Sequence, residues 1–157
     1  MSEAGTTPVY WQLIEPYWDK ISIYDGPTRF LREFGRAPQA VQSLFAAHWL
    51  QSEVCNGGFG QFFDNSTGVL APEAAAGFLT IGMPKVSAFV SDLIGGFGAD
   101  YPRDEDQRGA ALAEIDEAMS AANPLNIYVD QDFFDLLASE NGGFLVSANQ
   151  YAERFLQ

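Results

Sequence analysis

Apolar residues recur at intervals of three and four along most of the chain, the spacing that lines one face of an α-helix. From Val41 to Cys55 this spacing is nearly continuous, and Pro38 suits the first turn of that helix. Pro72 and Pro84 open two further helical patterns, and Gly82 suits the end of the first of them. The pattern predicts helices at about 10–17, 38–55, 72–81, 84–94, 105–119, 133–137 and 144–155.

The alternation of apolar and polar residues that is typical of β-strands is nearly absent. Residues 21–24 and 126–129 are the only short strand candidates, and Gly or Pro interrupts the sequence near each. No linker divides the chain. We therefore predict an all-α fold, a single compact domain of seven or eight short helices over residues 1–157.

Composition agrees with a compact fold and narrows the class of protein. The 157 residues are 47% hydrophobic and 14% aromatic, which excludes disorder and predicts a core built around large rings. The single cysteine, Cys55, excludes an internal disulfide framework and a multi-cysteine zinc site. The start of the sequence lacks the basic and apolar pattern of a secretory signal, so we expect a soluble, cytoplasmic protein.

The net charge of the chain limits the classes of partner that it can bind. The formal net charge is −13, from 21 Asp and Glu against 8 Lys and Arg. Nucleic acids and anionic membranes are polyanions, so we expect the chain to bind neither directly. Its expected partner is a basic protein, such as a DNA-binding protein or transcription factor, and a homodimer is left open.

Most of the negative charge lies in residues 92–140, which hold twelve acids and two bases, a net charge of −10. Acids at predicted helix starts are explained by the helix macrodipole: Asp104, Glu105, Asp106, Asp130 and Asp132. Four others have no Lys or Arg nearby in the sequence and are the candidate partner-binding residues: Glu114, Asp116, Glu117 and Asp135. A solvated surface without a partner is the alternative interpretation.

The sequence offers little for catalysis or metal binding. His48 is the only histidine, and it lies two helical turns from Cys55 within an apolar stripe, which indicates packing. A calcium loop starting at Asp104 would place Arg108 and Ile115 where oxygen ligands are needed. We therefore predict no catalytic residue, no metal site, no cofactor and no enzymatic activity.

Residues 53–68 stand out as a glycine-rich turn followed by an aromatic segment. Phe59, Phe62 and Phe63 have the spacing to bury together on one side of a short helix. Glu53, Asn56, Gln61 and Asn65 are polar neighbours of those rings, and Gly57 and Gly58 form the turn. The polar groups either satisfy hydrogen bonds where the chain turns or line a small polar pocket.

The pattern Glu-x-x-Asn-Gly-Gly-Phe-x-Gln-Phe-Phe-x-Asn-Ser-x-Gly at 53–68 resembles the signature of a bacterial family named after an acidic DNA mimic protein. Further matches follow in order: Glu73 and Ala74, Leu79-x-Ile81-Gly82, Tyr101-Pro102-x-Asp104, Phe133-Phe134 and Tyr151. The family-like core is residues 38–156, and residues 1–37 lie outside the resemblance. Cys55 departs from the family pattern, in which another Asn is common.

The resemblance implies a helical fold and no established enzyme activity. The mimic presents carboxylates in place of DNA phosphates, and the net charge of this chain is consistent with that role. The leading hypothesis is a non-enzymatic acidic interaction protein that occupies a basic DNA-binding protein. The alternatives are a small-molecule-binding or enzymatic protein with a pocket at 53–65, and an immunity or regulatory protein that recognises a partner by shape.

Overall fold

The computed structural model describes residues 7–122 and 126–156, and over these residues it forms eight α-helices, two short 3-10 helices and no strand. The predicted all-α fold is therefore confirmed. The helices are α1 (Trp11–Trp18), α2 (Pro27–Gly35), α3 (Gln39–Asp64), η1 (Ser66–Leu70), α4 (Ala71–Thr80), α5 (Pro84–Gly95), α6 (Glu105–Ala122), α7 (Asn126–Ser139), η2 (Glu140–Gly142) and α8 (Phe144–Glu153).

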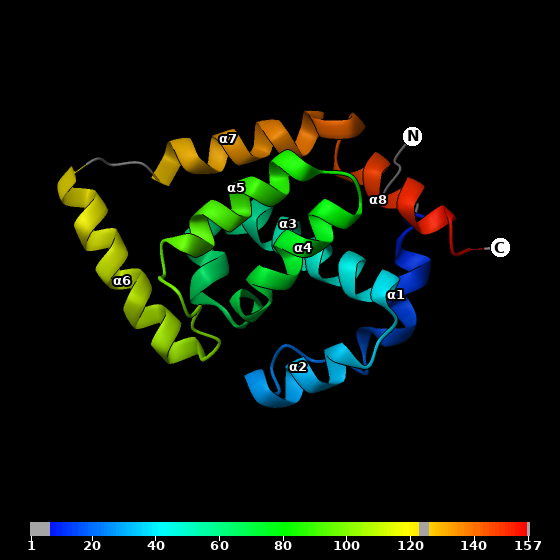
Figure 1. The fold of residues 1–157 in the computed structure, drawn as a ribbon, viewed down its shortest axis with the longest axis horizontal. Coiled ribbons are helices and arrows are strands. Elements are labelled where there is room, and N and C mark those ends of the chain that lie inside the picture. Colours follow the sequence, from blue (N-terminus) through cyan, green and yellow to red (C-terminus); the bar gives the residue numbers. More distant parts are fainter. Residues whose placement is uncertain (1–6, 123–125, 157) are drawn as a thin grey trace.

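Helix α3 lies at the centre, α4 packs against α3, and α5 packs against α4 (Figure 1). The core is aromatic, as the composition predicts. Five phenylalanines from four helices are fully or almost fully buried: Phe30, Phe45, Phe62, Phe78 and Phe133. Burial of large rings stabilises such a core by removing apolar surface from water.

Helix α7 lies along α5 and contacts α3, while α6 packs against α3 and η1 (Figure 1). The link between α4 and α5 comprises residues 81–83. Pro84 is the first residue of α5, as predicted, and Gly82 lies in the turn before it with φ +92°, which glycine adopts without strain.

Neither strand candidate is a strand, and one helix was not predicted. The segment 126–129 is the start of α7 and not a strand, because helix packing decides between the two periods in so short a stretch. Residues 21–24 form turns. Helix α2 was not predicted, although its two buried residues, Phe30 and Phe34, have the i, i+4 spacing of a helix face.

His48 belongs to the packing between α1 and α3. Its ring lies among Tyr10, Trp11 and Trp18, and its Nδ1 atom is 2.7 Å from the Tyr10 hydroxyl. Burial lowers the pKa of His48 to about 4 and raises that of Tyr10 to about 12, so both side chains are uncharged near neutral pH and share this one hydrogen bond. Cys55 is exposed on α3 and does not share this environment.

Candidate functional site

The glycine turn at 56–58 is a single break within α3. Gly58 has φ +84° and ψ 174°, a conformation that is essentially confined to glycine, and the helix continues on both sides of it. Asn56 and Gly57 are still helical. The break redirects the chain so that the aromatic segment after Gly58 turns into the core.

Asp130 of α7 closes this break. Its Oδ1 atom accepts a hydrogen bond of 3.0 Å from the backbone N–H of Phe59, the first residue of the redirected helix. A Cβ on Gly58 would collide with the other carboxylate oxygen of Asp130. The sequence suggested Asp130 as a cap of its own helix, but α7 begins at Asn126. The carboxylate instead caps the second half of α3.

Glu53 is the shared hydrogen-bond acceptor of residues 53–68, which we call the signature segment. Its carboxylate accepts hydrogen bonds from Gln61 Nε2 at 2.9 Å, Thr67 Oγ1 at 3.0 Å and Asn65 Nδ2 at 3.4 Å. Gly57 makes room for this arrangement, because a Cβ there would overlap the side-chain amide of Gln61. Because three side chains of the protein donate to the Glu53 carboxylate, these residues have a structural role in the turn. Thr67 belongs to this hydrogen-bond network, although the sequence did not reveal it.

Asn56 differs from the other polar residues of the segment. Its side chain is exposed and makes no hydrogen bond to the described part of the chain. With Glu53 and Cys55 it lines an open hollow of about 490 Å³ on the outside of α3. This hollow is the place where the predicted pocket would lie.

We expect Gln61→Ala to lower the free energy of unfolding by about 2 kcal/mol, because Glu53 loses its shortest hydrogen bond in a partly buried place. Asn56→Ala is the matched control on the same helix and is expected to stay within about 0.5 kcal/mol of the wild type. Urea unfolding of the two variants checks this. Equal losses would mean that the Glu53 network does not set the stability of the segment.

Arg108 of α6 anchors the acidic part of the chain to the core. It is fully buried, and its guanidinium donates only to backbone carbonyls: Phe63 at 2.7 Å, Asn65 at 2.6 Å, Arg103 at 2.9 Å and Pro102 at 3.2 Å. Burial lowers its pKa, although an arginine keeps its charge. Gly68 permits this approach, because a Cβ there would lie 2.5 Å from Arg108 Nε.

Arg103, the other base of the segment 92–140, is also committed to the fold. It forms a bidentate pair with Glu73 of α4, with N–O distances of 2.6 and 3.0 Å, and donates to the Val69 carbonyl. The Tyr101 hydroxyl donates to the Gly68 carbonyl nearby, and burial raises its pKa. Among the described side chains, neither base of the segment forms an ion pair with a carboxylate of the segment.

Some acids of the segment have structural roles. Asp104 accepts from the backbone N–H of Gln107 and caps α6, as predicted. Glu140 accepts from the backbone N–H groups of Lys85 and Val86 at the start of α5. Among the described side chains, the four ion pairs involve Asp25, Glu33 and Glu73, and none uses a carboxylate of 92–140.

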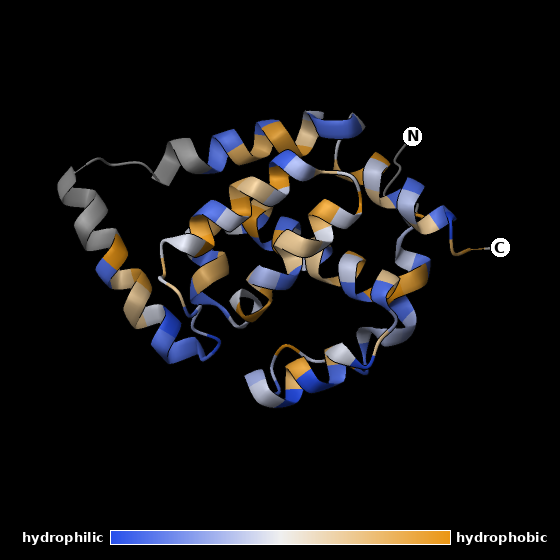
Figure 2. Ribbon diagram, in the orientation of Figure 1, coloured by the Kyte–Doolittle hydropathy of each residue, from blue (hydrophilic) through white to orange (hydrophobic). Residues whose placement is uncertain are grey.

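The candidate partner-binding residues are exposed where the structure describes them. Glu114 on α6 and Asp135 on α7 are exposed, and the only hydrogen bond to the Asp135 carboxylate from the described residues is a local one from Gln131. Asp116 and Glu117 lie outside the residues whose side chains are described. Figure 2 shows the hydrophilic start of α6 and a hydrophilic part of α7. These helices are the candidate acidic surface, which we define as α6 and α7.

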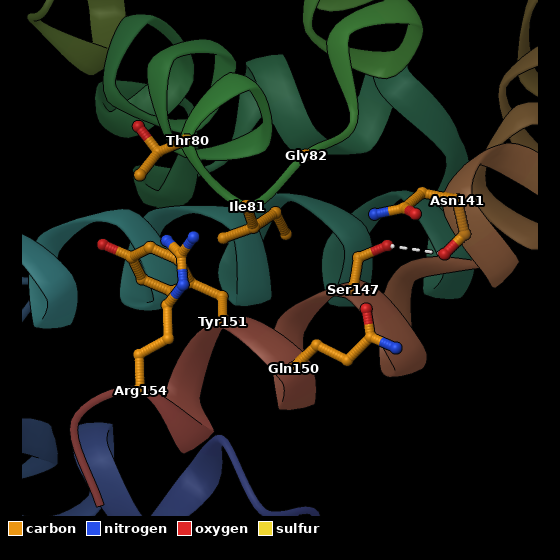
Figure 3. A pocket seen from close by; sticks show the side chains of 8 residues that line it. All are labelled: Thr80, Ile81, Gly82, Asn141, Ser147, Gln150, Tyr151 and Arg154. Carbon is orange, nitrogen blue, oxygen red and sulfur yellow. Dashed lines mark hydrogen bonds between the residues drawn. The ribbon is translucent and has the colours of Figure 1, made fainter.

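A polar pocket of about 280 Å³ lies away from this surface, between the end of α4 and α8 (Figure 3). The Arg154 guanidinium lies over the Tyr151 ring at 5.8 Å from its centroid, and Ser147 donates to the Asn141 carbonyl. None of these side chains was predicted as a site. Within the described residues there is no group of three His, Cys, Asp or Glu side chains that could hold a metal ion.

No helix in the described part of the chain combines the length and hydrophobicity needed to cross a membrane. A protein-family model described as DMP19-like protein matches residues 35–154. The chain therefore belongs to the DMP19-like protein family, which confirms the resemblance seen in the sequence. No curated protein and no solved structure gives a significant match.

Proposed function

We propose that this member of the DMP19-like family is a non-enzymatic acidic interaction protein that occupies the DNA-binding surface of a basic protein by DNA mimicry. The candidate acidic surface carries the contacts, through Glu114, Asp116, Glu117 and Asp135. The family match is consistent with a mimic, and the partner is a DNA-binding protein.

The observation that carries the proposal is the unneutralised charge of residues 92–140. Their net charge is −10. Of their two bases, Arg108 donates to backbone carbonyls and Arg103 pairs with Glu73, which lies outside the segment. Within the described residues, no carboxylate of this segment enters an ion pair. Unpaired like charges cost a monomer stability, and a cationic partner offsets that cost.

Rigid presentation supports mimicry over a simple acidic patch. Arg108 and the Asp104 cap fix the start of α6, and Asp130 fixes α7 against the break in α3. Carboxylates on anchored helices lose less conformational entropy on binding than those of a flexible acidic tail. Glu114 and Asp135 therefore lie on helices that the fold holds in place before a partner binds, as a mimic of DNA phosphates requires.

The test begins with a partner recovered by affinity purification from the native host at low salt. The variant Glu114→Gln, Asp116→Asn, Glu117→Gln, Asp135→Asn is expected to bind it about tenfold more weakly at low salt, and the difference shrinks as salt rises. Its melting temperature stays unchanged or rises, since self-repulsion falls. The wild type competes with duplex DNA for the partner.

A matched control removes four charges from exposed acids elsewhere: Glu15→Gln, Asp19→Asn, Asp25→Asn and Glu153→Gln. Equal affinity of the wild type and the first variant would exclude α6 and α7 as the contact surface. Equal weakening by both variants would mean that only total charge matters. Binding that is insensitive to salt and to DNA would favour an immunity or regulatory protein that recognises shape.

A further inference from the structure

An apolar groove lies where α3, α7 and α8 meet. Its volume is about 470 Å³, and none of its lining residues is charged. Phe134, Leu137 and Ala138 of α7 form one wall, and Phe144 and Leu145 at the start of α8 form the other. The groove therefore borders one of the two helices of the candidate acidic surface.

The groove is lined by side chains that the core leaves accessible. Leu145 is 53% exposed, and Ala138 is exposed on α7, whereas Leu137 and Phe144 are buried and form the floor. Val146, the neighbour of Leu145, is 43% exposed. Adjacent exposed apolar side chains beside a groove mark a place where an apolar ligand or partner segment can bind.

One exposed carboxylate, that of Asp135, lies on the helix that forms a wall of the groove. Asp135 and Ala138 are three residues apart on α7 and lie on the same face of that helix. Asp135 is exposed and has no ion pair among the described side chains. An apolar groove beside an unpaired carboxylate is complementary to a segment that carries both apolar and cationic side chains.

We propose that this groove holds an amphipathic helix of the basic partner, with its apolar side chains between α7 and α8 and its Lys or Arg side chains toward Asp135. The inference rests on the proposed function and adds a second component to it. DNA has no equivalent of the groove, so the groove selects among basic proteins where charge alone does not. Apolar burial is also insensitive to moderate salt, unlike the pairing of exposed charges.

The probe is a synthetic basic peptide of about five helical turns with Leu at i, i+4 and i+7. A second peptide has the same charge and carries Ala at those three positions. The wild type is expected to bind the Leu peptide about tenfold more tightly than the Ala peptide, and to keep this ratio at about 0.5 M salt. Fluorescence anisotropy of labelled peptides measures both affinities.

The variant Ala138→Gln, Leu145→Gln changes the groove without changing charge and is expected to lose the preference for the Leu peptide. The matched control is Ala76→Gln, Leu79→Gln, which makes the same two side-chain changes at exposed positions of α4, where Leu79 is 59% exposed. The control keeps the preference. A wild type without the preference, or a groove variant that retains it, overturns the proposal.

Sedimentation of the chain alone tests whether a second copy of the chain binds in the groove, because it measures the oligomeric state. Self-association that the groove variant abolishes would assign the groove to a second copy and overturn the proposal. Competition with duplex DNA separates this inference from the proposed function. A protein that displaces DNA but lacks the Leu preference contradicts the groove alone, and one with the preference that does not displace DNA contradicts mimicry alone.

Discussion

Replacing Arg108 with methionine is expected to lower the free energy of unfolding by about 4 kcal/mol, because one buried and three partly buried hydrogen bonds from a charged donor to carbonyls are lost. Two of these carbonyls belong to Phe63 and Asn65 at the end of α3, and two belong to the loop before α6. Methionine keeps the apolar stem of the side chain, so the loss reports the guanidinium. Urea unfolding monitored by circular dichroism measures it.

Two comparisons separate this contribution from charge alone. Arg36→Met removes the same charge from an exposed side chain that pairs only with Glu33, and its expected change is below about 0.5 kcal/mol. Arg108→Lys keeps the charge, but one ammonium cannot reach all four carbonyls, so its loss is intermediate. Wild-type stability of Arg108→Met would disprove the anchoring of α6 by this residue.

The sequence predicted the fold where local signals and packing agree. Pro84 and Gly82 set the limits of neighbouring helices, and the apolar stripe of 38–55 became the central helix α3. Prediction from the sequence failed where the choice between helix and strand depends on contacts with distant residues. The apolar segment 126–129 fits a strand or a helix by itself, and only its place at the start of α7 decides.

The polar network of the signature segment was visible in part. The sequence singled out Glu53, Gln61 and Asn65 as polar groups near aromatic rings, but it did not reveal which of them bond. Those contacts join residues eight and twelve positions apart, and they form because Gly58 redirects the chain. Thr67 was missed because its hydroxyl meets Glu53 only after that break and the turn of η1.

Buried charge was harder still to foresee. Arg108 looks like any surface base in a polar stretch, and nothing in its spacing shows that it is fully buried. Its burial has a consequence for function: Arg108 donates to backbone carbonyls and forms no ion pair with a carboxylate of residues 92–140 among the described side chains. The partner-binding assignment of Glu114, Asp116, Glu117 and Asp135 stays a prediction.

The second large effect is expected at the break in α3. Gly58→Ala is expected to lower the free energy of unfolding by about 4 kcal/mol, for two reasons. Alanine is strained at φ +84° and ψ 174°, which costs about 1–3 kcal/mol. Its Cβ also displaces the Asp130 carboxylate, so the Phe59 N–H loses a charged acceptor. Chemical unfolding measures the change.

Gly60→Ala is the matched control two residues further along α3. Gly60 is exposed and helical, its Cβ would meet nothing within 4 Å, and alanine there is expected to stabilise the chain by about 0.5 kcal/mol. A double-mutant cycle with Asp130→Ala isolates the second cause. Because the carboxylate is then absent, Gly58→Ala should cost less in that background than in the wild type.

The same cycle tests how α7 is held. If Gly58→Ala costs as much without Asp130 as with it, the strain is purely in the backbone and the carboxylate does not fasten α7 to α3. If the two changes are coupled, weakening this contact should loosen the helix that carries Asp135 and one wall of the apolar groove. Rigid presentation of the acidic surface then depends on a residue of the signature segment, although that residue contacts no partner.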